Sequence, residues 1–295
     1  LALAFDRLVV ATGSIMPRPG FPGADLCHAI DDWNSAMAFD ERLASLAREK
    51  APRVVVVGAG FTGIELALEL RDRVQVHAGP ERARQTDIVL VDRARHVGPE
   101  LGEGPRPVIT QALLAAGVRT RLGAGVSAVS AGGLTLATGE TIDCDIVVLC
   151  IGPQAAPFVG QIPGPKGPQG RLLVDAHLRV RDADRVFAAG DACCATPEPG
   201  RQTLMSCQHA LTLGKYAGEN AARDAMGLPL IPYAQPRYVT CLDLGRSGAV
   251  YSEGWERLPK LTGAAAKAVK TEINTRRIYP ATGSREEILA ASRIK

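Results

Sequence analysis

Three glycines stand at a spacing that binds a dinucleotide phosphate. Gly58, Gly60 and Gly63 form a Gly-x-Gly-x-x-Gly loop that follows the β-branched run of residues 54–57 and opens a helical pattern. In such a loop the first glycine permits the tight turn, the second lets the backbone approach a pyrophosphate, and the third lets the helix pack close to the strand. N–H groups at the start of the helix then bind the phosphates. The residues predicted to bind the dinucleotide are Gly58, Gly60, Phe61, Thr62 and Gly63.

An acidic residue ends the next predicted strand. Asp92 stands where such a unit binds the ribose diol of NADH. It lies 34 residues after Gly58, against the usual ~20, and the excess falls in the polar segment 71–86, which we interpret as a surface insertion. Arg93 and Arg95 could instead hold the 2′-phosphate of NADPH, and Asp92 could simply end a strand. We therefore expect NADH to be preferred, with these alternatives open.

One strand pattern occurs twice in the same register. Residues 6–13 align without a gap on residues 145–152, and each copy has an acid, a short apolar run and a turn that ends in glycine. This form is typical of a parallel strand buried on both faces. The second copy closes the unit that contains Gly58, whereas the first copy has no glycine loop before it. We therefore expect the chain to be a fragment in which the first of two dinucleotide-binding units has lost a phosphate loop upstream of Leu1.

The remaining elements are predicted more coarsely. Residues 32–50 and 105–116 have the patterns of helices, and residues 125–142 that of an antiparallel meander. After the Pro/Gly-rich linker of residues 161–170, a buried strand at residues 186–189 delivers Gly190 and Asp191 to its carboxyl end. Asp191 could bind a ligand there or simply cap a helix.

Composition narrows the classes of function. The chain has 295 residues, of which 46% are hydrophobic and 22% charged, and its net charge of +3 is too small to indicate nucleic acid as a partner. No apolar run reaches the ~18 residues that a bilayer span needs. The seven cysteines contain no Cys-x-x-Cys and fit a reducing cytoplasm, with Cys193 and Cys194 as buried thiols. We expect no metal site.

The order of the motifs resembles the flavin-dependent pyridine nucleotide oxidoreductases of the glutathione-reductase fold. The motifs are the Ala-Thr-Gly turn of residues 11–13, the central glycine loop with Glu65 after it, and the late strand that ends in Gly-Asp. Within that group, residues 203–233 and 238–255 resemble the type II NADH dehydrogenases, single-subunit flavoproteins that pass electrons from NADH to quinone. The resemblance runs from Leu1 to about residue 290 and implies FAD and NAD(H) as cofactors.

The resemblance also implies roles for individual residues. Asp191 would bind the ribityl and phosphate part of FAD, Glu65 would lie near flavin and nicotinamide, and Gly152 would lie beside the nicotinamide. Gln208 matches the first glutamine of a pair near flavin and quinone, but Thr212 replaces the second, which leaves the acceptor open. His209 could tune the flavin or simply pack in the core. The residues expected at FAD are Ala11, Thr12, Gly13, Gly190, Asp191, Gln208, His209 and Ala210, and those expected to be catalytic are Glu65 and Gln208.

The predicted fold is α/β, with two Rossmann-like units. The NAD(P)H unit, residues 53–152, is inserted in an incomplete FAD unit made of residues 1–52 and 153–232, and a small α+β region follows at residues 233–295. The predicted function is hydride transfer from NADH to FAD and on to a quinone or another acceptor. One alternative is a non-catalytic NAD-binding fragment or redox sensor. Another is a sulfide:quinone reductase, for which Cys150 and Cys207 are the candidate thiols.

Partners and location are predicted only in outline. NADH and a small-molecule electron acceptor are the expected partners, and a cytoplasmic location is expected. The basic, weakly apolar helix of residues 262–278 leaves open a peripheral contact with the inner face of the cell membrane, but a solvated helix or one that faces a homodimer partner fits its composition better.

Overall fold

The computed structural model describes residues 4–294 and divides the chain into two compact units. The first unit comprises the residues up to Ile15, Pro153–Tyr238 and the residues from Glu272 on, and the second comprises Met16–Gly152 and Val239–Thr271. The opening residues 1–3 of the expected FAD unit lie outside the described part.

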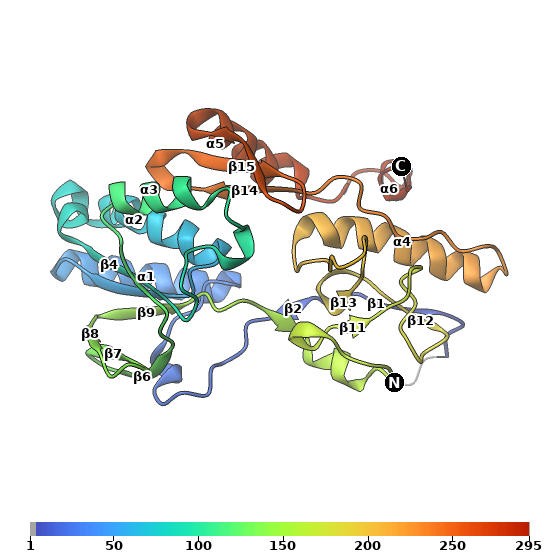
Figure 1. Ribbon diagram of the computed structural model, residues 1–295, viewed down its shortest axis with the longest axis horizontal. Helices are drawn as coiled ribbons and strands as arrows, with labels where there is room; N and C mark the ends of the chain where they lie inside the picture. The colour runs from blue at the N-terminus through green and yellow to red at the C-terminus, as the bar shows by residue number, and fades with distance from the viewer. Residues whose placement is uncertain (1–3, 295) are drawn as a thin grey trace. The chain divides into compact units, whose positions relative to one another are not determined.

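A parallel sheet of four strands, in the order β5-β4-β3-β9, forms the centre of the second unit. The strands are β3 (Arg53–Val57), β4 (Asp87–Asp92), β5 (Arg119–Leu122) and β9 (Ile146–Leu149). The strand order reverses between β3 and β9, and nucleotides bind in open α/β sheets at the carboxyl ends of strands at such a switch point. The predicted α/β class with a Rossmann-type unit is confirmed (Figure 1).

Each face of this sheet carries its own layer. Val54 and Val56 of β3 pack against the helices, whereas Val55 and Val57 pack against the strands of the meander. Figure 1 shows the helices on one side of the sheet and the meander on the other. The helices are α1 (Trp33–Glu49), α2 (Phe61–Gln85) and α3 (Arg106–Ala115), and the meander is β6 (Val126–Ser130), β7 (Gly133–Leu136) and β8 (Thr141–Asp143). The predicted helices at residues 32–50 and 105–116 and the meander at residues 125–142 are confirmed.

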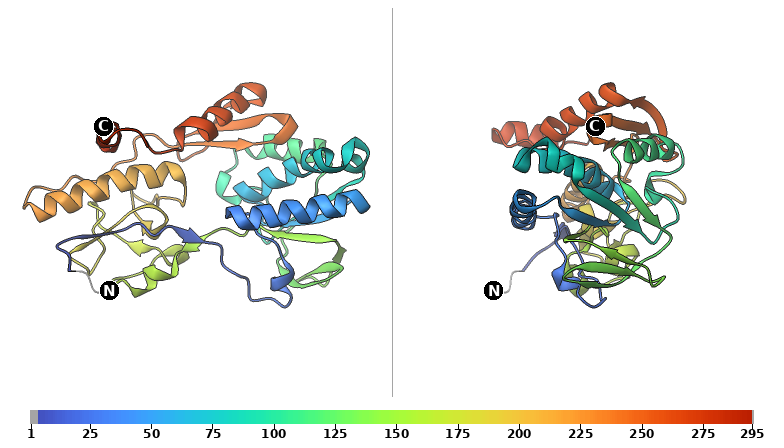
Figure 2. Two further views of the ribbon diagram at one scale, coloured as in Figure 1. Left: turned by 180° about the vertical axis from the view of Figure 1, so that it is seen from behind. Right: turned by 90° about the vertical axis from the view of Figure 1, so that its left-hand side faces the viewer.

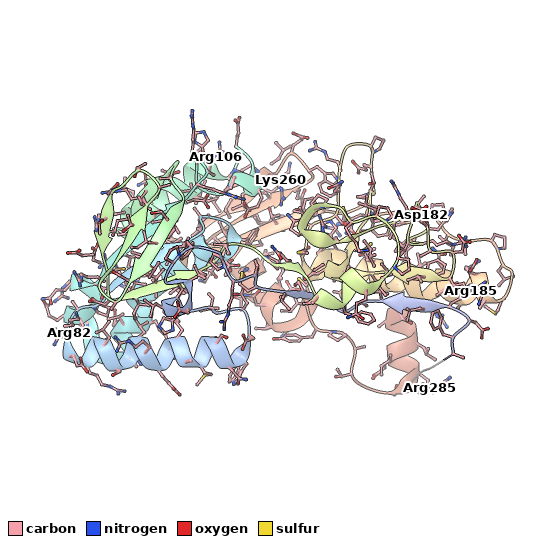
Figure 3. All side chains as sticks on the ribbon, turned by 90° about the horizontal axis from the view of Figure 1, so that it is seen from below. Arg82, Arg106, Asp182, Arg185, Lys260 and Arg285 are labelled. Carbon is pink, nitrogen blue, oxygen red and sulfur yellow. The ribbon has the colours of Figure 1, made fainter. Side chains whose placement is uncertain are left out.

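The expected surface insertion at residues 71–86 is wrong, because α2 continues through it. The helix bends at Gly79, whose φ is 82°, and then resumes to Gln85. Val74 and Ala83 are buried in the core, so the polar residues of this segment form the outer face of a helix. Arg82, labelled in Figure 3, donates to the carbonyl of Glu49 at 3.1 Å and links the end of α2 to that of α1. Figure 2 shows these two helices running side by side.

The C-terminal region is divided between the two compact units. It begins with an antiparallel sheet, in which Leu242 and Val250 join the core around α2. The sheet and the helix after it are β14 (Val239–Asp243), β15 (Ala249–Glu253), β16 (Leu258–Thr262) and α5 (Gly263–Glu272). Helix α1, expected in the FAD domain, also packs in the second unit through Phe39 and Leu43. The compact units therefore change after residues 15, 152, 238 and 271, whereas the predicted boundaries lie after residues 52, 152 and 232.

The first unit pairs strands from distant parts of the sequence. β1 (Leu8–Val10) runs parallel to β12 (Val186–Ala188), and α4 (Cys207–Ala225) packs against β12. The other strands and helices of this unit are β2 (Ser14–Ile15), β10 (Gln154–Ala155), β11 (Leu172–Leu173), β13 (Cys193–Cys194), η7 (Ile273–Arg277) and α6 (Arg285–Ser292). The other short helices among residues 4–294 are η1 (Ala24–Leu26), η2 (Pro99–Leu101), η3 (Pro157–Gln161), η4 (Pro168–Gly170), η5 (Gly190–Ala192) and η6 (Gly245–Ser247).

β1 differs from the strand that the sequence predicted. We expected burial on both faces, but Val10 is buried while Val9 is 37% exposed. Its paired strand is β12 in a sheet of two strands. By contrast β9, the second copy of the pattern, is buried at all four positions between two layers. The shared sequence form therefore gives the same strand direction but unequal burial.

Candidate functional site

The glycine loop lies at the carboxyl end of β3, beside the end of the neighbouring strand β9. Gly58 has a φ of 110°, and a Cβ atom there would overlap the carbonyl of Cys150. A Cβ atom on Gly63 would overlap the carbonyl oxygen of Gly58 and lie 3.4 Å from the Cβ atom of Cys150. The first turn of α2 is therefore pressed against the loop and the end of β9. The roles predicted for the first and third glycines match this geometry.

Helix α2 begins at this loop without a side-chain cap. Gly60 is the N-cap residue, and the backbone N–H of Phe61 donates to Oε1 of Glu100 at 3.0 Å. Thr62 is exposed at the next position. A helix start of this kind presents N–H groups and positive dipole charge to an anion. The sequence analysis missed Glu100, although the signal was an acid that closely follows the predicted ribose-binding strand.

Asp92 lies at the carboxyl end of β4, where the sequence placed it. Its carboxylate accepts hydrogen bonds from the backbone N–H of Ala59 (2.6 Å) and that of Ala94 (2.7 Å). Each oxygen keeps a further lone pair for a ribose hydroxyl. The side chain therefore holds the glycine loop in place. Arg93 and Arg95 are exposed on the segment that follows.

Glu65 lies one turn along α2 and is engaged by the C-terminal part of the same unit. Its Oε1 accepts a hydrogen bond from the backbone N–H of Asp243 (2.8 Å) and pairs with Nζ of Lys270 (2.8 Å). The same ammonium group lies 5.7 Å from the centre of the Phe61 ring. Lys270 thus connects α5 to the start of α2, a contact that the sequence analysis did not predict. Gly152, expected beside the nicotinamide, follows β9 and is exposed.

The residues predicted for the flavin come together in the first unit. Because β1 and β12 are parallel, the Ala11-Thr12-Gly13 turn and the Gly190-Asp191 pair leave the same edge of the sheet. Ser14, which the sequence analysis did not single out, donates from its hydroxyl to Oδ2 of Asp191 at 2.6 Å. The carboxylate of Asp191 is thereby oriented, and its remaining lone pairs can accept hydrogen bonds from a polyol.

Helix α4 is the third segment that lies beside the Gly190-Asp191 pair. Ser206 caps the helix, and its Oγ lies 2.9 Å from Nδ1 of His209. His209 is fully buried, with its ring 5.0 Å from that of Tyr238, so its contacts favour packing in the core. Ala210 lies beside Gly190, where a Cβ atom would be 3.7 Å from its methyl group. Gln208 is half-buried on the first turn of the helix.

Comparison with known proteins decides the family. The model of the family described as pyridine nucleotide-disulphide oxidoreductase matches residues 1–214. The chain belongs to this family. A relative in the same comparison, an NADH dehydrogenase-like protein of Mycobacterium tuberculosis, is 44% identical over 295 residues, which cover 98% of this chain and 74% of the relative. A demethylphylloquinone reductase of Synechocystis is 30% identical, over 85% of this chain and 62% of that protein.

Solved structures of other oxidoreductases share the fold. A water-forming NADH oxidase from Lactobacillus brevis bound to NADH superposes with a TM-score of 0.65 at 24% identity, over 90% of this chain and 55% of that one. An FAD-dependent pyridine nucleotide-disulphide oxidoreductase from Desulfovibrio vulgaris gives a TM-score of 0.63 at 23% identity, over 85% and 61% of the two chains. At these identities the likeness shows the fold alone.

The two sites of this oxidoreductase fit the groups that such a family binds. The loop at Gly58 leaves its second glycine without a Cβ atom in front of a helix start, which suits a pyrophosphate. The oriented carboxylate of Asp191 suits a ribityl chain. Among the described residues, no group of three or more His, Cys, Asp or Glu side chains is arranged to hold a metal ion.

The cysteines of this oxidoreductase are free thiols. Cys193 and Cys194 are buried, as predicted, and burial raises the pKa of both. Burial also raises the pKa of Cys150 to about 12, so this thiol stays protonated at neutral pH. Cys207 is exposed at the start of α4. A redox reaction through a thiolate at Cys150 is therefore disfavoured.

A hollow in the oxidoreductase lies at the end of the central sheet opposite to the glycine loop. It encloses about 400 Å³ near the amino ends of β3, β4 and β5. Its arginines are paired: Arg119 with Asp87, Arg121 with Glu140 at 2.8 Å, and Arg53 with Asp145 at 2.8 Å. Because these charges are compensated, the hollow is a weaker candidate site than the glycine loop.

Proposed function

We propose that this chain takes hydride from NADH onto FAD and passes the electrons to a quinone or another small acceptor. The class, an FAD-dependent NAD(P)H oxidoreductase, follows from the family. The observation that carries the proposal is the glycine loop at the carboxyl ends of β3 and β9, within the same chain as the Ser14–Asp191 pair. FAD, when bound, supplies the hydride-accepting ring, and the chain supplies binding and orientation.

A quinone is the acceptor that the relatives favour. One relative is named a demethylphylloquinone reductase and another an NADH dehydrogenase-like protein. In this chain Gln208 occupies the first position of the glutamine pair, while Thr212 bonds back to the carbonyl of Gln208 at 3.3 Å. Gln208 is therefore proposed to act at the acceptor side, and Glu65 on the nicotinamide side.

The direct test is NADH consumption by the purified chain with added FAD and a water-soluble quinone. We expect the absorbance of NADH at 340 nm to fall only when both FAD and quinone are present, and to fall faster with NADH than with NADPH. Binding of NADH without oxidation would instead favour the non-catalytic module. Quinone reduction by sulfide but not by NADH would favour the sulfide:quinone reductase.

Replacing Asp92 with alanine should weaken NADH more than NADPH. The lost carboxylate removes a charge-assisted bond to a ribose hydroxyl, worth about 1.5 kcal/mol or more, and hence about tenfold in affinity. It also removes the repulsion of a 2′-phosphate. The control is Asp87→Ala at the other end of the same strand, which breaks only the pair with Arg119. Equal losses of affinity for NADH and NADPH would mean that Asp92 contributes only by its hydrogen bond with the backbone N–H of Ala59.

Location and assembly stay predictions. No helix among residues 4–294 is both long and apolar enough to cross a bilayer. Helix α5 carries Lys267 and Lys270, but both ammonium groups pair with acids of the same unit, Asp243 and Glu65. This pairing weakens the case for α5 as a basic membrane anchor. We retain a cytoplasmic chain, with peripheral contact at the inner face of the cell membrane and a homodimer as the two arrangements to test.

A further inference from the structure

Other residues of the same chain form hydrogen bonds with the glycine loop that is proposed to bind phosphate. Gly58 N–H donates to the carbonyl of Val91 at 2.7 Å, and Ala59 N–H to Asp92 at 2.6 Å. Gly98 N–H donates in turn to the carbonyl of Ala59 at 2.7 Å. The segment from β4 to η2 therefore follows the glycine loop along its length.

Glu100 completes this contact at the start of α2. Its Oε1 accepts from the N–H of Phe61 at 3.0 Å and lies 2.6 Å from the point where a Cβ atom of Gly60 would stand. A carboxylate oxygen thus fills the space that the missing side chain of Gly60 leaves open. This is the space that a pyrophosphate needs in a loop of this form.

We propose that Glu100 is a displaceable anion at the pyrophosphate position. In the free protein it satisfies Phe61 N–H and the positive charge of the helix start, as a phosphate oxygen would. NADH must push it aside, because two anions cannot share one donor. The inference rests on the proposed function, and it names a residue that sets the affinity of that site and selects for diphosphates.

Several features of Glu100 fit such a movement. It is exposed on the short helix η2, so its side chain can rotate into solvent without opening the core. The adjacent Leu101 is buried and keeps η2 attached to the unit. A diphosphate brings more negative charge to the helix start than one carboxylate does. Single weak anions compete less well, so Glu100 favours the dinucleotide over inorganic phosphate.

Calorimetric titration of the full chain with NADH tests the proposal. Glu100→Gln should tighten NADH by about threefold to tenfold, because the competing charge at the helix start is gone. Glu100→Asp, which keeps the charge on a shorter side chain, should also tighten it. Inorganic phosphate should compete with NADH more strongly in Glu100→Gln than in the unaltered chain.

Glu103→Gln is the matched control. It removes one negative charge from the same segment, but its side chain is 94% exposed and pairs at 4.0 Å with Arg106; we expect the same NADH affinity as the unaltered chain. Unchanged or weaker binding in Glu100→Gln, with NADH still bound by the unaltered chain, would overturn the inference alone. Absence of NADH binding in every variant would overturn the proposed function as well.

Discussion

Replacing Gly63 with alanine should abolish NADH binding and lower the free energy of unfolding by about 1–3 kcal/mol. The added methyl group would overlap the carbonyl oxygen of Gly58 and contact Cys150, and both of these residues are buried. The strand, the loop and the helix must separate to admit it, and the phosphate position separates with them. Denaturant unfolding followed by calorimetric titration measures both effects.

Gly218→Ala is the control for this change. Gly218 lies in helix α4, and a Cβ atom there meets nothing within 4 Å. Alanine at such a helical position should stabilise the protein by about 0.5–1 kcal/mol and leave NADH binding unchanged. Full NADH affinity in Gly63→Ala would show that the close approach at Gly63 is not needed for the site.

Replacing Asp191 with alanine should weaken FAD by about tenfold to a hundredfold, since a hydrogen bond to a charged group is worth about 1.5–3 kcal/mol. The carboxylate is held by the Ser14 hydroxyl at the joint end of β1 and β12, so its position is fixed before a ligand arrives. Titration of the apoprotein with FAD, followed by flavin fluorescence, gives the two affinities.

Asp184→Ala supplies the control for charge. Asp184 is an exposed residue of the loop before β12, between Asp182 and Arg185, which Figure 3 labels. Its loss removes the same charge at the opposite end of the same strand and should leave FAD affinity unchanged. If Asp191→Ala binds FAD as tightly as Asp184→Ala does, Asp191 has only the alternative role of a cap.

Much of the second unit was predictable because its signals are local. The β-branched run of β3, the glycines after it and the acid at the end of β4 specify a Rossmann unit within a continuous stretch of chain. The segment of residues 71–86 was predicted to be a surface insertion because a polar helix face and a Gly-Pro pair are also typical of loops, and burial is not known from the sequence. The burial of Val74 and Ala83 makes it a helix.

The contacts that complete the sites were not predictable from one sequence. Ser14 meets Asp191 and Lys270 meets Glu65 across long separations, and nothing in either residue's neighbours marks its partner. Glu100 was missed for another reason. Its role depends on the space that the missing Cβ atom of Gly60 leaves, and a single sequence does not show which side chain fills that space.

The pairing of β1 with β12 also sets an order of folding. The Ser14–Asp191 bond joins residues 177 positions apart, whereas the central sheet of the other unit is complete between Arg53 and Leu149. Contacts between distant residues must overcome a larger loop-closure entropy and form more slowly. During synthesis from the N-terminus, the central sheet of the second unit can therefore form before β12, the partner of the strand at residues 8–10, has been synthesised. Until β12 leaves the ribosome, that strand lacks this neighbour, and the edge that β12 later covers is exposed to other chains.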